Sequence, residues 1–120
     1  MLKVYGLKNC DNCRKALNWL KSENIEHQFL DIRKDGFSEV ELKRWLSVLG
    51  HEQLINRRGT SWRKIDPSIQ ESLSEVNAAS LVMSEPALMK RPIFDDGKKL
   101  VLCGFKNQQQ DILNLFSSLK

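Results

Sequence analysis

The sequence lacks any long run of apolar residues. No stretch approaches the ~20 apolar residues of a membrane-spanning helix, so we expect no membrane span. It also lacks a long basic run or interleaved basic and aromatic residues, so we expect no direct nucleic-acid binding despite a formal net charge of +4. A strand pattern begins at Leu2, which leaves no room for a signal peptide in this interpretation.

Cysteine and histidine are also scarce. Three cysteines are an odd number, which argues against a secreted disulfide framework and favours a reducing cytoplasm. A zinc site needs about four ligands. The residues that could complete one with Cys10 and Cys13 are Cys103, His27 and His51. None has the paired spacing of metal ligands, so we expect no metal and no tightly bound cofactor.

The residues that are present converge on the stretch Cys10-Asp11-Asn12-Cys13. Before it, Leu2 to Tyr5 alternate between apolar and polar, which predicts a strand that Gly6 ends. After it, the apolar spacing becomes that of a helix, with Cys13, Ala16, Leu17 and Leu20 on one face. We therefore expect Cys10 at the N-terminus of a helix and Cys13 one turn inside.

At this position the Cys10 thiol should ionise readily. The N–H groups of a first helical turn carry partial positive charge, and Lys8, Arg14 and Lys15 add more. Such surroundings can lower a thiol pKa from ~8.5 to roughly 3.5–7.5. Residues three apart on a helix are neighbours, so Cys13 can reach Cys10. We interpret Cys10 as an attacking thiol and Cys13 as a resolving one, ahead of a half zinc site or two packed cysteines.

The rest of the chain alternates strands and helices. Residues 25–32 predict a second strand, parallel to the first. Ser38 and Glu41 have capping-box spacing and predict the start of a helix that Gly50 ends. Shorter helices are expected after Asp66 and after Asn77, whereas Arg63 and Lys64 are expected on a solvated loop.

Near the C-terminus, the turn Asp95-Asp96-Gly97-Lys98 predicts a hairpin. Leu100 to Cys103 form its returning strand, in which we expect Cys103 to be buried, as free cysteines often are. A last helix follows. The order predicts an α/β, thioredoxin-like fold, a mixed four-stranded sheet flanked by helices. It makes one domain, with a core of residues 1–37 and 89–120 and a helical insertion over 38–88.

Three stretches resemble the ArsC/Spx family, which includes arsenate reductases, the Spx redox regulators and YffB-like proteins thought to be glutathione-dependent thiol reductases. They are residues 8–15, residues 56–64, and residues 90–93 followed by 102–105. The Arg-Gly-Thr-x-Trp-Arg-Lys stretch that begins at Arg58 is most similar to the YffB-like branch. The resemblance implies a thioredoxin-like core with a helical insertion.

The same resemblance implies roles for individual residues. Cys10 matches the nucleophilic cysteine. Pro92 matches a proline that is cis in thioredoxin-like folds, and Arg91 matches the arginine before it. Arg58 matches an arginine of the insertion, with Arg57 as the alternative. Arginines beside a thiolate can bind an oxyanion. The candidate substrate- or anion-binding residues are Arg14, Arg58 and Arg91.

Two departures from the family pattern argue against arsenate as substrate. Gly104 stands where arsenate reductases have a third arginine, and Gly6-Leu7-Lys8-Asn9-Cys10 replaces their His-Asn-Pro-x-Cys. Cys13 stands where those reductases use another residue, and it matches the switch of the Spx regulators.

Two functions stay open. The first is a cytoplasmic thiol-dependent reductase. Its Cys10 attacks a small oxidised thiol or an oxyanion, and glutathione, glutaredoxin or Cys13 resolves the intermediate. The alternative is an Spx-like regulator, in which a Cys10–Cys13 disulfide alters a surface that contacts the RNA polymerase alpha subunit. A non-catalytic thioredoxin-like domain fits the cations beside the cysteines less well.

Overall fold

The computed structural model describes residues 2–98 and 101–119. The chain divides into two compact units, one formed by residues 1–36 and 91–120 and the other by residues 37–90. The grouping of the whole chain into one domain, with a core over 1–37 and 89–120, stays a prediction.

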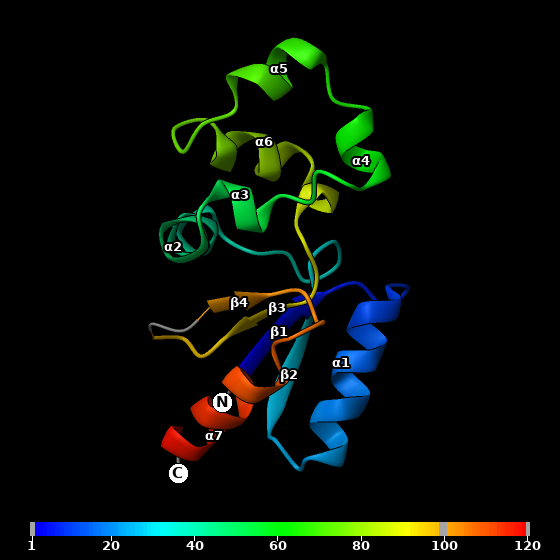
Figure 1. Ribbon diagram of the computed structural model, residues 1–120, viewed down its shortest axis with the longest axis vertical. Coiled ribbons are helices and arrows are strands. Elements are labelled where there is room, and N and C mark those ends of the chain that lie inside the picture. Colours follow the sequence, from blue (N-terminus) through cyan, green and yellow to red (C-terminus); the bar gives the residue numbers. More distant parts are fainter. Residues whose placement is uncertain (1, 99–100, 120) are drawn as a thin grey trace. The chain divides into compact units, whose positions relative to one another are not determined.

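The first unit is built around a four-stranded sheet (Figure 1). Its elements are β1 (Leu2–Gly6), α1 (Asp11–Ser22), β2 (His27–Asp31), β3 (Ile93–Asp95), β4 (Val101–Cys103) and α7 (Gln109–Leu119). The strand order is β2-β1-β3-β4. Strands β1 and β2 are parallel, whereas β3 runs antiparallel to both β1 and β4. The mixed sheet flanked by helices is therefore confirmed, while Leu100 lies outside the described residues.

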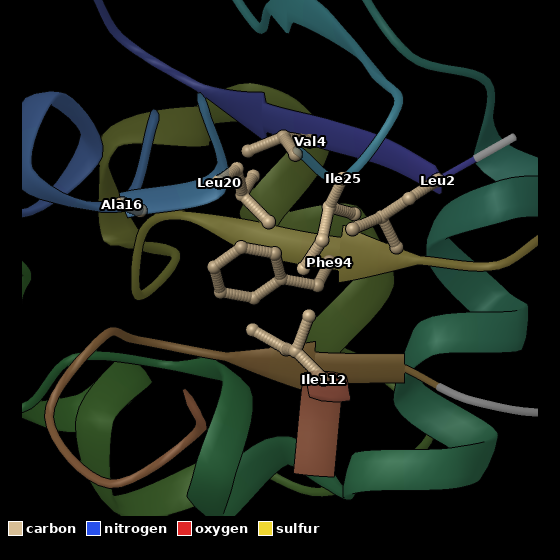
Figure 2. Close-up of a cluster of buried hydrophobic side chains, with 7 residues drawn as sticks. All are labelled: Leu2, Val4, Ala16, Leu20, Ile25, Phe94 and Ile112. Carbon is tan, nitrogen blue, oxygen red and sulfur yellow. The ribbon is translucent and has the colours of Figure 1, made fainter. Parts of the chain in front are cut away.

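One face of the sheet packs on α1 and α7 through a buried apolar cluster (Figure 2). Its fully buried members are Leu2, Val4, Ala16, Leu20, Ile25, Phe94 and Ile112. Burying an aliphatic or aromatic side chain contributes about 1.5–3 kcal/mol, so the cluster fixes the rotation of α1 against β1. Cys13 lies on the same face of the helix as Ala16 and Leu20, and this rotation buries it.

The second unit is helical. Its elements are α2 (Glu39–Leu49), α3 (His51–Leu54), α4 (Thr60–Arg63), α5 (Pro67–Ser72), α6 (Ala78–Ser84) and the 3₁₀ turn η1 (Pro86–Leu88). The capping box is confirmed, because the Glu41 N–H donates to the Ser38 hydroxyl at 3.0 Å and the Ser38 N–H donates to the Glu41 carboxylate at 3.2 Å. Gly50 ends α2 with a φ of 80°.

Two local expectations were wrong. The segment that contains Arg63 includes one helical turn, α4, although Arg63 and Lys64 are exposed as expected. Gly59 precedes this turn in an extended conformation, and its carbonyl oxygen accepts the Arg63 N–H. Cys103 is only half-buried. Strand β4 stands at the end of the strand order, next to β3, and the last two residues of β4 keep partial exposure.

Candidate active site

Cys10 is the N-cap residue of α1. Its backbone is extended, with φ −95° and ψ 122°, and its carbonyl oxygen accepts the Arg14 N–H at 3.0 Å. Its own N–H donates to the Leu7 carbonyl oxygen at 3.2 Å, which fixes the turn between β1 and the helix. The side chain is half-buried. The thiol therefore lies where the first N–H groups of the helix have no carbonyl partners in the preceding turn.

Two neighbouring residues favour the ionised form of Cys10. Partial burial acts to raise the pKa of Cys10, whereas hydrogen bonding with Cys13 and with Arg91 acts to lower it. The positive charge of Arg91 acts in the same direction. Together these contacts outweigh burial, and the pKa of Cys10 lies below its ordinary value.

Cys13 has the opposite character. Its side chain is 0% exposed. Burial raises its pKa to about 12, and the hydrogen bond and negative charge of the neighbouring Cys10 act in the same direction. The Leu7 N–H and the charge of Arg91 oppose this only in part. At neutral pH Cys10 is therefore the better nucleophile, and Cys13 is a protonated thiol held beside it.

The segment that carries Arg91 returns to the sheet at β3. The Arg91–Pro92 peptide bond is cis, and the Pro92 carbonyl oxygen accepts the Gly104 N–H at 2.8 Å. This hydrogen bond continues the antiparallel pairing in which Ile93 faces Cys103. The pairing fixes the backbone at Pro92, immediately after Arg91.

Arg14 makes a different contact. Its guanidinium donates to the Asp11 carboxylate at 2.6 Å, and the two side chains are 62% and 81% exposed. Such exposed pairs contribute about 0–1 kcal/mol. The contacts that lower the pKa of Cys10 come from Cys13 and Arg91. A role for Arg14 in anion binding stays a prediction.

Arg58 belongs to the helical unit. Its backbone N–H donates to the Asn56 side-chain oxygen at 3.1 Å, and its side chain is exposed. The adjacent Arg57 guanidinium stacks over the Trp62 ring, 5.5 Å from the centroid. Of the two arginines, Arg57 is thus the one engaged by an aromatic ring. An anion-binding role for Arg58 stays a prediction.

Sequence reasoning missed two contributors to the site. One is the Leu7 N–H, which acts to lower the pKa of Cys13. The other is Gly6, which was interpreted only as a strand breaker and lies directly against Cys13. The only signal for either was closeness to the cysteine pair in the sequence.

Two other kinds of feature are absent from the described residues. Among residues 2–98 and 101–119, no three or more histidine, cysteine or acidic side chains are placed to hold a metal ion. Within the same ranges, no helix combines the length and the apolarity that crossing a membrane requires.

Comparisons with known proteins cover most of the chain. The model of the ArsC family matches residues 5–112. An uncharacterised protein of Haemophilus influenzae is 42% identical over 91% of this chain and 95% of its own length. The regulatory protein MgsR of Bacillus subtilis is 32% identical over 84% of this chain and 81% of its own length. The solved structure of a YffB protein has a TM-score of 0.85 and 32% identity, covering 93% of this chain and 97% of its own.

Proposed function

Because the chain belongs to the ArsC family and has its thioredoxin-like fold, we propose that it is a glutathione-dependent thiol reductase with Cys10 as nucleophile. One observation carries the proposal: Cys10 is the N-cap residue of α1, and its neighbours Cys13 and Arg91 lower the pKa of its thiol. A thiolate, not a thiol, attacks a disulfide, so these contacts favour the reactive form.

The proposed reaction is a sequence of two thiol–disulfide exchanges. The Cys10 thiolate attacks the glutathione sulfur of a mixed disulfide, forms a Cys10–glutathione disulfide and releases the substrate thiolate. A second glutathione thiolate then attacks the bound glutathione sulfur, which yields oxidised glutathione and regenerates the Cys10 thiolate. The net reaction converts the substrate mixed disulfide to a free substrate thiol and oxidises one free glutathione thiol, which joins the glutathione released from the substrate as oxidised glutathione.

Cys13 offers a second route for the same intermediate. It can attack the Cys10 sulfur, form the Cys10–Cys13 disulfide and release glutathione, after which glutathione or glutaredoxin reduces the pair. Loss of the Cys10 charge on adduct formation removes one of the causes that raise the pKa of Cys13. Burial remains the larger cause, so we propose that external glutathione is the main resolving thiol.

The cationic side chains suit anionic substrates. Glutathione carries two carboxylates, and an arginine can bind a carboxylate or an oxyanion through paired hydrogen bonds. We assign Arg91 to this role beside Cys10, with Arg14 and Arg58 as further anion-binding candidates. The reaction needs no tightly bound cofactor, and it belongs in the cytoplasm, where glutathione keeps thiols reduced.

The decisive experiment compares wild type with Cys10→Ser and Cys13→Ser in glutathione-coupled disulfide reduction. Cys10→Ser should abolish turnover, because a serine hydroxyl is a far poorer nucleophile than a thiolate. Cys13→Ser should retain substantial turnover, because external glutathione replaces it. Mass spectrometry should find the glutathione adduct on Cys10. An adduct on Cys13 alone, or turnover lost only in Cys13→Ser, would reverse the assignment.

A second candidate function follows from the likeness to the regulatory protein MgsR. In this alternative the Cys10–Cys13 disulfide is the signal, and it alters a surface that contacts the RNA polymerase alpha subunit, as the Spx resemblance implies. Both serine variants would then leave every reductase assay unchanged. A pull-down of the alpha subunit with oxidised and reduced protein separates the two functions.

A further inference from the structure

Gly6 lies directly against the sulfur of Cys13. A Cβ atom built on Gly6 would be 2.5 Å from the Cys13 Sγ, and 3.4 Å from both the Cys13 Cβ and the Phe29 Cε1. Carbon atoms pack most favourably at about 3.5–4.0 Å. The sulfur therefore occupies space that any side chain at position 6 would take.

The backbone does not explain a glycine here. Gly6 is the last residue of β1, is paired with Asp31 of β2, and is not among the glycines with positive φ. Alanine could adopt this strand conformation. Of the three nearest atoms, only the Cys13 Sγ lies closer than an ordinary van der Waals contact. The backbone at position 6 would therefore allow alanine, but the space that its side chain needs is occupied.

The Cys13 sulfur has three neighbours, at Gly6, Leu7 and Cys10. It occupies the space that a Cβ atom at Gly6 would take, the Leu7 N–H acts to lower its pKa, and Cys10 acts to raise it. Gly6 and Leu7 are adjacent at the end of β1, so one short piece of backbone determines where this sulfur lies. That position in turn determines whether the thiol reaches Cys10.

We propose that Gly6 is a positioning residue: its missing side chain provides the space in which the Cys13 sulfur lies, and this aims the Cys13 thiol at Cys10. The inference rests on the proposed function only in taking Cys10 as the attacking thiolate. Alanine at position 6 would displace the sulfur by about 1 Å to restore an ordinary contact. The displaced thiol would then donate poorly to the Cys10 thiolate, because hydrogen bonds weaken with distance and misalignment.

The same displacement affects disulfide formation. Oxidised glutathione reacts with the Cys10 thiolate to give the Cys10–glutathione disulfide and one glutathione thiolate. Cys13, once deprotonated, attacks the Cys10 sulfur and releases the second glutathione. The Gly6→Ala variant should form the first adduct but convert it more slowly to the internal disulfide.

The test compares wild type, Gly6→Ala, Cys13→Ala and the double variant Gly6→Ala/Cys13→Ala. The readouts are the alkylation rate of Cys10 against pH and, where Cys13 is present, the internal disulfide formed with oxidised glutathione. In each single variant, alkylation below the pKa should slow by about two- to tenfold, as expected for one lost hydrogen bond. The double variant should alkylate like Cys13→Ala, because the atom that alanine would displace is gone. Gly36→Ala, which introduces strain at a φ of 75° away from the pair, is the control and should leave Cys10 alkylation unchanged.

Each outcome decides the proposal. Wild-type alkylation in Gly6→Ala would overturn it, and so would a Gly6→Ala effect that persists beside Cys13→Ala. If Gly6→Ala does not fold, a folded double variant supports the proposal, whereas failure of both to fold overturns it. None of these readouts needs turnover. Failure of the proposed function would be recognised separately, because a Cys10→Ser variant would then remain active in the glutathione-coupled assay.

Discussion

The N–H of Gly104 donates a hydrogen bond of 2.8 Å to the carbonyl oxygen of Pro92, which ties the turn after β4 to the segment of Arg91. Gly104 has a φ of 81°, in the left-handed region that most residues avoid. The left-handed conformation of Gly104 and its hydrogen bond to Pro92 are therefore parts of the same turn. A side chain at this position would disturb the backbone beside Arg91 before it could contribute any charge.

The first prediction concerns arsenate. Wild-type arsenate reduction should be weak or absent, because the missing arginine would supply a charge-assisted hydrogen bond worth roughly 1.5–3 kcal/mol, about ten- to a hundredfold or slightly more. Gly104→Arg should not restore it and should lower the free energy of unfolding by about 1–3 kcal/mol, from left-handed strain. Gly104→Asn, which tolerates this region better, should lose less. Efficient glutathione-dependent arsenate turnover by wild type would contradict the prediction.

The second prediction compares two half-buried thiols. Cys10 should be alkylated faster than Cys103 at neutral pH, although both are partly accessible. The reason is that Cys10 has the lowered pKa and a cap position, whereas Cys103 lies in β4. Site-resolved mass spectrometry of partially alkylated protein measures both rates in one sample. Equal rates would remove the case for an activated thiolate.

The third prediction isolates Arg91. Arg91→Gln should raise the pKa of Cys10 and slow its alkylation below that pKa, because a hydrogen bond to a charged group and a nearby positive charge are lost together. The hydrogen bond alone corresponds to roughly tenfold or more. Arg33→Gln is the matched control, since Arg33 is an exposed arginine of the same unit. A pH profile unchanged in Arg91→Gln would show that Arg91 does not contribute to the activation of the thiol.

The fourth prediction concerns stability at alkaline pH. The pKa of Cys13 is about 12 in the folded protein, whereas a free thiol titrates near ~8.5. Above ~8.5 the unfolded chain gives up this proton and the folded chain keeps it, so the free energy of unfolding falls as pH rises through this window. The lowered pKa of Cys10 acts in the opposite sense, but only below ~8.5.

Urea unfolding of wild type and Cys13→Ala near pH ~8.5 and ~10 measures this effect. Wild type should lose more stability over the interval than Cys13→Ala, because the variant lacks the thiol that ionises in the unfolded chain and stays protonated in the folded one. Parallel losses in the two proteins would mean that Cys13 titrates in the folded state much as it does in the unfolded chain.

Local chemistry explains which parts of the fold were predictable. The Ser38–Glu41 box depends on residues three apart, and the cap position of Cys10 depends on a change of periodicity within a few residues. Both lie within reach of pattern reasoning. The single turn α4 was missed, because its four residues are too few to show helical periodicity.

The site was predictable only in part, because its partners come from distant positions. Lys8, Arg14 and Lys15 were expected to supply the charge beside Cys10, since they are its neighbours in sequence. The cation that acts to lower the pKa of Cys10 is Arg91, which only the family resemblance indicated. Gly6 was missed for a different reason. It is close to Cys13 in the sequence, but a residue without a side chain gives no sequence pattern that predicts this role.

The separation of Cys10 from Arg91 in the sequence also determines when all the neighbours that lower the pKa of Cys10 are present during synthesis. Strand β3 pairs with β1 through Lys3 and Asp95, so this pairing cannot form until the intervening helical unit has left the ribosome. Domains generally fold as units while the chain is made. A nascent chain that ends before Arg91 holds both cysteines but lacks the arginine that stabilises the Cys10 anion. The set of neighbours that lowers the pKa of Cys10 is thus complete only late in synthesis, together with completion of the sheet.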